Sequence, residues 1–139
     1  MKQIAGLLLA LTIGLAACEK EKIENDETRV ASASAERELY GRYLGTFTRN
    51  GMTEASVNIL FRSDNTFEGT SDNPRYPVIC SGTYNQQGST LTVNNSCKSQ
   101  SVPDPSLLFD GTYTITFKSE REVTITRGED RYELAQMQR

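Results

Sequence analysis

Residues 39–61 read LYGRYLGTFTRNGMTEASVNILF, and this stretch decides the fold. In both of its halves large apolar side chains alternate with polar or small ones, which is the period of a half-buried β-strand. Asn50-Gly51 lies between the halves, and this pair tolerates the positive φ of a tight hairpin turn. The stretch therefore predicts two antiparallel strands that turn their large side chains toward a common core.

The same alternation continues to the C-terminus. Turn-forming residues separate the later strands, at 63–65, 85–88 and 110–111. Two proline-bearing segments, residues 72–77 and 98–106, predict loops, because proline cannot donate to a strand ladder. The expected strands are 39–48, 55–61, 66–70, 78–84, 89–93, 112–118, 122–127 and 131–136. Eight short strands with frequent turns predict an all-β antiparallel barrel or sandwich.

Bulky side chains recur on the expected inward face: Tyr43, Phe47, Phe61, Phe67, Tyr84, Tyr113, Phe117 and Tyr132. Glycines at 41, 45, 69 and 82 alternate with them. An eight-stranded barrel is just wide enough to be filled by side chains or to hold one small ligand. The sequence leaves both outcomes open, a filled core and a pocket for a small apolar molecule.

The N-terminus predicts export. Lys2 precedes an apolar run that ends at Ala17 and is shorter than the roughly 20 residues that span a bilayer. A charged start, a short apolar core and small residues before a cleavage point are typical of a secretory signal. Leu15-Ala16-Ala17-Cys18 resembles the lipobox of bacterial lipoproteins, in which the signal is removed and the cysteine is acylated. The resemblance implies a signal peptide over residues 1–17 and a lipidated Cys18.

Residues 18–37 follow as an acidic segment with few large apolar side chains. Such a composition cannot bury enough surface to order itself, so we expect a flexible tether. The expected location is the cell envelope, with the lipid held in the outer membrane and the domain on its periplasmic or its surface face. Residues 38–139 would then form the barrel domain.

Composition excludes several classes of function. The 139 residues include 18 acidic and 15 basic side chains, and no histidine. Without histidine there is no Ser-His-Asp or Cys-His nucleophile, and two cysteines beside Cys18 cannot form a Cys-rich zinc site. The mildly acidic balance argues against a nucleic-acid partner. We therefore expect no enzymatic activity, no cofactor and no metal.

Cys80 and Cys97 predict a disulfide, because exported proteins fold where such bonds persist and Cys18 is expected to be acylated. Two buried free thiols are the alternative. The bond would join the bases of the two proline-bearing loops. Arg75 and Tyr76 belong to residue types that often serve as interface anchors, so they are candidates for partner binding. Plain connections with a stabilising bond are the other interpretation.

Leu39-Tyr40-Gly41-Arg42-Tyr43 resembles the Gly-x-Trp opening of lipocalins, with Tyr in place of Trp. The eight strands, the export signal and Tyr132-Glu133-Leu134 are similar to the lipocalin-like lipoproteins of Bacteroidetes. The resemblance covers roughly residues 38–137 and implies an eight-stranded meander barrel that binds a small apolar ligand. Two other functions stay open: an interaction module or inhibitor of lysozyme or protease type acting through loops 72–77 and 98–106, and a structural surface lipoprotein.

Overall fold

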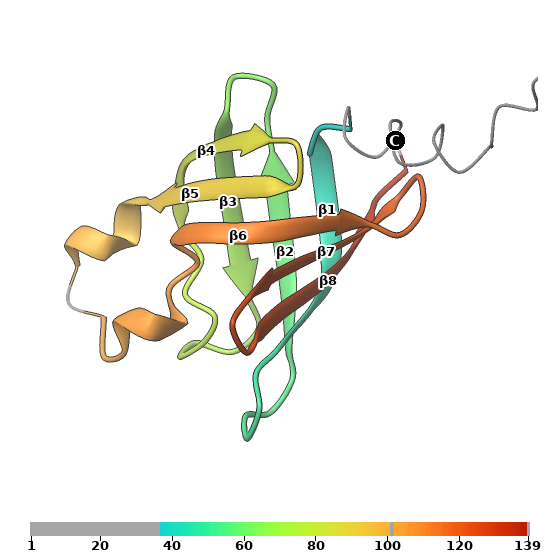
Figure 1. Ribbon diagram of the computed structural model, residues 1–139. Helices are drawn as coiled ribbons and strands as arrows, with labels where there is room; N and C mark the ends of the chain where they lie inside the picture. Colours follow the sequence, from blue (N-terminus) through green and yellow to red (C-terminus); the bar gives the residue numbers. More distant parts are fainter. Residues whose placement is uncertain (1–36, 101, 139) are drawn as a thin grey trace, which may run out of the picture.

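A computed structural model describes residues 37–100 and 102–138 (Figure 1). Each strand pairs antiparallel with the next, and β1 pairs with β8, so the sheet closes into a barrel. The strands are β1 (Gly41–Thr48), β2 (Ala55–Phe61), β3 (Thr66–Ser71), β4 (Ser81–Gln87), β5 (Thr90–Asn95), β6 (Gly111–Phe117), β7 (Glu122–Arg127) and β8 (Asp130–Gln136). The all-β eight-stranded meander is therefore confirmed. The expected signal peptide, Cys18 and most of the expected tether lie outside the described residues.

The first hairpin shows how the alternation becomes a core. Tyr43 pairs with Ile59 and Phe47 with Ala55, and all four side chains are buried. Gly51 in the hairpin turn has a φ of 76°, the positive region that the Asn-Gly pair predicts. Side chains one position along either strand point outward, as the pleat of a strand requires.

Aromatic side chains fill the barrel. Seven of the eight predicted interior side chains are at most 7% exposed, and neighbouring ring centroids lie 4.9 to 6.4 Å apart. Phe117 is the exception, because it is only half-buried and packs at the margin of the core. The guanidinium of Arg37 lies 5.2 Å from its ring centroid. Tight packing of this kind matches the interior of other small barrels.

The expected strand over 78–84 is wrong at both ends, since β4 spans 81–87. Residues 78–80 leave the ladder because Val78 pairs instead with the β5–β6 loop: its N–H donates to Leu107 and its carbonyl accepts from Phe109. At the other end the ladder extends to Gln87, so the expected turn over 85–88 shrinks to Gly88 and Ser89. The expected strand over 89–93 likewise runs to Asn95 as β5.

The two ends of the barrel differ. At the end where the chain enters and leaves, residues 62–65, 88–89 and 118–121 form short turns; we call it the tether end (Figure 1). At the other end lie the longer connections 49–54, 72–80 and 96–110, together with the 128–129 turn; we call it the loop end. The longest of them carries two short 3-10 helices, η1 (Ser96–Ser99) and η2 (Pro105–Leu107), which the sequence pattern did not predict.

Leu39 closes the tether end. Its side chain is 1% exposed, its N–H donates to Oε1 of Gln86 (2.8 Å), and its carbonyl lies 3.0 Å from the Tyr84 hydroxyl. That hydroxyl is also 2.8 Å from the carbonyl of Arg62, so it can donate to either oxygen. Burial raises the pKa of Tyr84 to about 12. The chain therefore passes across this end of the barrel before β1 begins, and the buried Leu39 side chain covers the interior there.

Candidate functional site

The loop end is the candidate site, because the longer connections meet there on a rigid barrel. A disulfide joins Cys80, just before β4, to Cys97 in η1, with Cα atoms 6.0 Å apart. The predicted pairing is thus confirmed. It fastens the β3–β4 loop to the β5–β6 loop at their bases.

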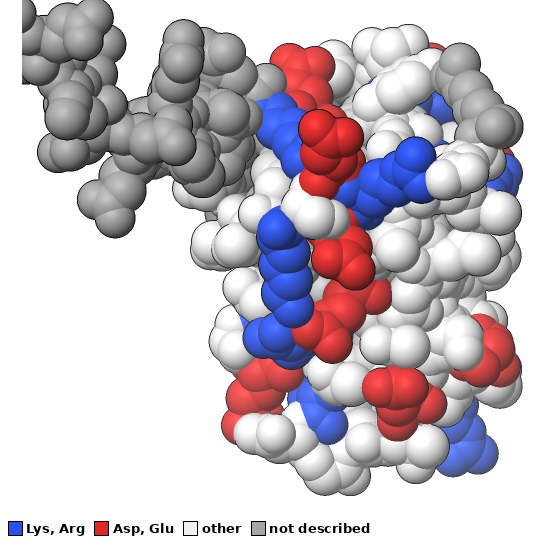
Figure 2. Space-filling view, turned by 90° about the vertical axis from the view of Figure 1, so that its right-hand side faces the viewer, with Lys and Arg blue, Asp and Glu red and all other residues white. Residues whose placement is uncertain are grey.

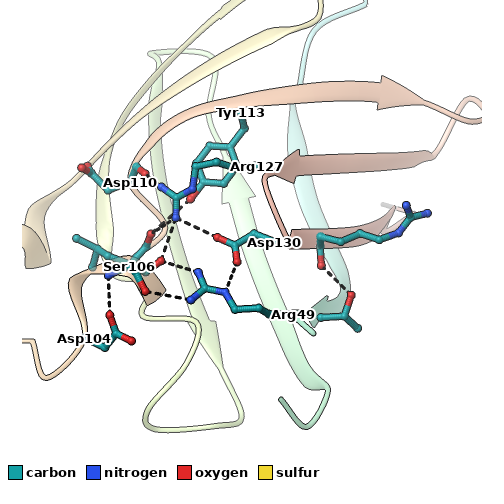
Figure 3. Close-up of polar contacts among 10 residues, drawn as sticks. Arg49, Asp104, Ser106, Asp110, Tyr113, Arg127 and Asp130 are labelled. Atoms are coloured by element: carbon teal, nitrogen blue, oxygen red, sulfur yellow. Dashed lines mark hydrogen bonds and ion pairs between the residues drawn. The ribbon is translucent and has the colours of Figure 1, made fainter. Parts of the chain in front are cut away.

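A second set of contacts closes the loop end around Asp130, whose side chain is nearly fully buried (Figure 3). Its Oδ1 accepts from Nε of Arg49 at 2.5 Å, and its Oδ2 accepts from Nη2 of Arg127 at 3.0 Å. Arg49 also donates to Oγ of Ser106 (3.0 Å) and to the Ser106 carbonyl (2.7 Å). We call these four residues the arginine clasp.

Arg127 ties the clasp to the β5–β6 loop (Figure 3). It donates to the carbonyl oxygens of Asp110, Ser106 (3.1 Å) and Leu108 (3.3 Å), while its guanidinium lies 4.7 Å from the ring centroid of Tyr113. The arginine clasp therefore binds the β1–β2, β5–β6 and β7–β8 connections into one unit. Planar guanidinium groups suit this task, since they donate several hydrogen bonds in a fixed geometry.

Behind the arginine clasp, the β5–β6 loop inserts a plug into the barrel. Phe109 is fully buried, and its ring centroid lies 5.6 Å from that of Phe67, 5.1 Å from Tyr113 and 5.0 Å from Tyr132. These contacts place Phe109 at the loop-end mouth of the interior. The space in which an open barrel would receive a ligand is filled by this side chain.

Asn95 holds the plug in position although it is a buried polar residue. Its amide nitrogen donates to the carbonyls of Phe109 (3.1 Å) and Val78 (3.2 Å), and its Oδ1 accepts from the N–H of Cys97 (3.0 Å). Its backbone N–H donates to the Asp110 carboxylate at 2.7 Å. Full satisfaction of this amide makes its burial compatible with stability.

The arginine clasp is suited to closure rather than to chemistry. Both oxygens of Asp130 are engaged by guanidinium groups, and the hydrogen bond to Asp130 raises the pKa of Arg49. Burial raises the pKa of Tyr113 to about 12 and raises that of Tyr132 strongly, so neither phenol serves as a base near neutral pH. Residues 37–100 and 102–138 contain no cluster of three or more potential metal ligands.

The two predicted partner-binding residues have different surroundings. Arg75 is exposed, and its guanidinium makes no hydrogen bond or ion pair with the described part of the chain. Tyr76 is half-buried and leans on the core, with its ring centroid 6.4 Å from that of Phe47. Both line an open hollow of about 480 Å³ together with Glu54 and residues 72–74. Arg75 is therefore the accessible member of the pair, and Tyr76 supports it.

The other proline-bearing loop is also displayed to solvent. Pro103, Asp104 and Pro105 are exposed, and Asp104 caps η2 by accepting from the Ser106 N–H at 2.9 Å. Hydrogen bonds from Ser106 lower the pKa of Asp104, so it carries a negative charge at neutral pH. Loops 72–77 and 98–106 thus lie at one end of the barrel, and each carries exposed charges of both signs: Asp72 and Arg75 in the first, Lys98 and Asp104 in the second.

Sequence reasoning missed the residues that build this end: Asn95, Phe109 and the arginine clasp. The only signal was the apolar run 107–109 directly after a proline-bearing loop. Comparison with protein-family models, with curated proteins and with solved structures finds no match to this chain. Within residues 37–100 and 102–138, no helix has the length and apolar character needed to cross a membrane.

Proposed function

We propose that this chain is a membrane-anchored envelope lipoprotein whose lipocalin-like barrel works as a protein-interaction module. Loops 72–77 and 98–106 would form its binding surface. The filled interior carries this proposal: Phe109 and the aromatic side chains beneath it occupy the space that a carrier of small apolar molecules would keep open. Binding is then left to the outside of the barrel.

The construction of the loop end supports the same function. The disulfide and the arginine clasp hold the loops in one arrangement before any partner arrives. Pre-organised loops lose less conformational freedom on binding, which is how rigid inhibitors gain affinity. Arg75 and Asp104 offer exposed charges of opposite sign for specific pairing.

The anchor rests on the lipobox at residues 15–18, which lies outside the described residues. A chain held at Cys18 would approach the barrel from the tether end, because residue 37 precedes β1 there (Figure 1). The loop end would then face away from the point of attachment and be free to meet a partner. Replacement of Cys18 by Ala should move the protein from the membrane fraction to the soluble fraction.

Site-specific photocrosslinking in the native host tests the binding surface. A photoreactive side chain would replace Arg75 or Asp104 at the loop end and, as matched exposed controls, Asp64 or Glu120 at the tether end. We expect a discrete crosslinked protein at both loop-end positions and at neither control. An Arg75→Ala variant should weaken the Asp104 crosslink. Absence of loop-end crosslinks, with Cys18 still anchoring the chain, would overturn the interaction module and leave the structural surface lipoprotein and the carrier.

Native mass spectrometry tests the competing carrier function. The purified chain would be mixed with a long-chain fatty acid as the apolar probe, and bound stoichiometry would be read directly. We expect no saturable one-to-one complex, because the interior is filled. A complex that forms with the original chain and is lost on Phe67→Trp, which adds bulk to the core, would support the carrier and count against the interaction module.

A further inference from the structure

The exposed large apolar side chains of the described residues gather on one side of the barrel. Tyr40, Leu44 and Met137 are 45%, 40% and 48% exposed, and they lie on or beside β1 and β8. Leu44 stands opposite Ala135 in the β1–β8 pairing, and the Met137 N–H donates to the carbonyl of Arg42 at 2.8 Å. The three side chains therefore share the outer surface of a single strand junction.

Two hollows follow the same junction. One of about 570 Å³ at the tether end is lined by Tyr40, Leu60 and Met137 together with Arg42 and Arg62. A smaller one of about 280 Å³ is lined by Leu44 and Ala135 among others. We call Tyr40, Leu44, Leu60, Ala135 and Met137 the apolar seam. It runs from the tether end toward the middle of β1.

Acidic and basic side chains lie close together around the apolar seam, and several of them pair with one another. On the side of the molecule seen in Figure 2, acidic and basic side chains are interleaved in a column. Part of this pairing is internal: Glu133 accepts from Lys118 at 2.9 Å and from Arg131 at 2.7 Å. Arg42 differs, because the partner of its Nη1 is the neutral Asn58 side chain (2.8 Å). The Arg42 guanidinium thus borders the apolar seam without a direct ion pair to the described residues, and Glu68 is the carboxylate whose charge acts on it.

We propose that the apolar seam lies against the surface of the membrane that holds the anchor. Tyr40, Leu44 and Met137 would enter the boundary between headgroups and acyl chains, and Arg42 would meet lipid phosphates. Tyrosine is enriched at membrane interfaces, and arginine buries its stem while its charged head stays among polar groups. This inference rests on the anchoring at Cys18 in the proposed function.

Attachment explains why a small surface is enough. Residues 19–36, even fully extended, reach no further than about 60 Å, so the barrel can never leave the neighbourhood of the bilayer. Short linkers of this kind give effective concentrations in the millimolar range. A contact too weak to recruit a free protein would therefore be occupied much of the time in the tethered one.

Hydroxyl-radical footprinting on vesicles tests the proposal. The lipidated mature chain would be placed in vesicles of phosphatidylethanolamine and phosphatidylglycerol, and side-chain oxidation would be compared with that of the Cys18→Ser chain in solution. We expect oxidation of Tyr40 and Met137 to slow at least about fivefold, because side chains in the membrane interface are out of reach of dissolved radicals. Met52 in the β1–β2 connection at the loop end is the internal control and should be unchanged.

A pair of variants separates the apolar seam from the anchor. Leu44→Ser combined with Met137→Ser should abolish the protection of Tyr40, while flotation shows that the chain stays on the vesicles. Met52→Ser is the matched control, and it should leave the protection of Tyr40 and Met137 intact. Circular dichroism and thermal melting of each variant confirm that the barrel is folded.

Each remaining outcome has a clear meaning. Full oxidation of Met137 and Tyr40 on floating vesicles overturns the membrane contact but not the anchor. If the chain does not float with the vesicles, the proposed anchoring at Cys18 is wrong. Coupling Cys18 to a maleimide lipid then restores a tether, and footprinting of that chain tests the membrane contact of the apolar seam alone. Protection already present in solution, or protection that depends on protein density at constant lipid, means that the chain's own N-terminal segment or a second copy covers the surface. Either result overturns the proposal.

Discussion

Asp130 is the residue on which closure of the loop end depends. Its carboxylate is almost completely buried between two guanidinium groups, so removing its charge leaves Arg49 and Arg127 without their shared partner. Asp130→Asn should lower the free energy of unfolding by about 3 kcal/mol, the cost of breaking a buried ion pair on one side. Urea denaturation followed by circular dichroism measures this loss.

Glu133→Gln is the control for that prediction. Glu133 also pairs with two cations, Lys118 and Arg131, which lower its pKa to about 2, but all three side chains are about half exposed. Exposed pairs contribute roughly 0–1 kcal/mol because water and salt screen them. Equal losses from the two variants would show that the arginine clasp contributes no more than an ordinary surface pair.

At this scale the sequence predicts apolar positions well and polar ones poorly. Tyr43 and Phe47 can be recognised from the sequence because they belong to an alternation of large and small or polar residues within one strand. Asp130 carries no such signal, since its partner Arg49 is 81 positions away along the chain. Asn95 is similar, because it stabilises the loop end through hydrogen bonds to the carbonyls of Val78 and Phe109. These carbonyls come together only in the folded protein.

Among the elements, the junction between β1 and β8 is the one that closes the barrel. A Cβ atom on Gly45 would lie 1.8 Å from the carbonyl oxygen of Glu133, so the two strands can approach only because Gly45 has no side chain. Gly45→Ala should destabilise the barrel by about 3 kcal/mol, or prevent closure altogether, because the backbone cannot yield as a flexible side chain can.

Thermal unfolding of Gly45→Ala beside Thr46→Ala measures this effect. Thr46 is the next residue on β1 and is half-buried, so its truncation should cost no more than about 1 kcal/mol. Similar melting temperatures for the two variants would mean that β1 and β8 can move apart to accept a Cβ atom without loss of stability.

The disulfide between Cys80 and Cys97 stabilises the two long loops, and its removal measures by how much. The two cysteines are 17 positions apart, and closing a loop of that length adds about 3 kcal/mol in the chain-entropy model. Replacing both by Ala should lower the free energy of unfolding by about that amount and speed hydrogen exchange at the Phe109 N–H. Thiol labelling under denaturing, non-reducing conditions should modify neither Cys80 nor Cys97 of the original chain; labelling of both would refute the bond.

The ends of the strands show where the local sequence pattern no longer predicts the structure. The expected second and seventh strands match β2 and β7 to the residue, and the third and eighth differ by one residue, because alternation and turn residues agree there. Residues 78–80 also alternate, yet they leave the sheet because backbone groups near η2 compete for Val78. Prolines predicted both loops of the candidate site, but no local pattern could predict that the β5–β6 loop folds back and plugs the barrel.

For the whole molecule, the filled interior predicts an alkaline transition. Burial raises the pKa of Tyr43, Tyr84, Tyr113 and Tyr132 in the folded state. Since the folded values are raised above the unfolded value of about 10, the stability linked to these phenols is complete below about pH 10. It is lost as the pH rises toward 12, because only the unfolded chain can release these protons easily.

Phenolate absorbance and circular dichroism, recorded together against pH, check this prediction. The absorbance of the four buried phenols should appear in step with loss of the β-sheet signal. Ionisation of all six tyrosines near pH 10 without loss of the sheet signal would mean that water reaches the interior. That result would also reopen the question of a binding cavity.

The pairing of β8 with β1 has a consequence for crowding. Proteins concentrated in a plane meet their neighbours constantly, and an unsatisfied backbone margin on one copy can recruit strands from the next into a growing aggregate. In the ring formed by β1 to β8 every strand has a paired strand on both sides, so no strand lies at an open edge of the sheet. With the anchoring proposed above, many copies would lie side by side on a membrane and remain separate molecules.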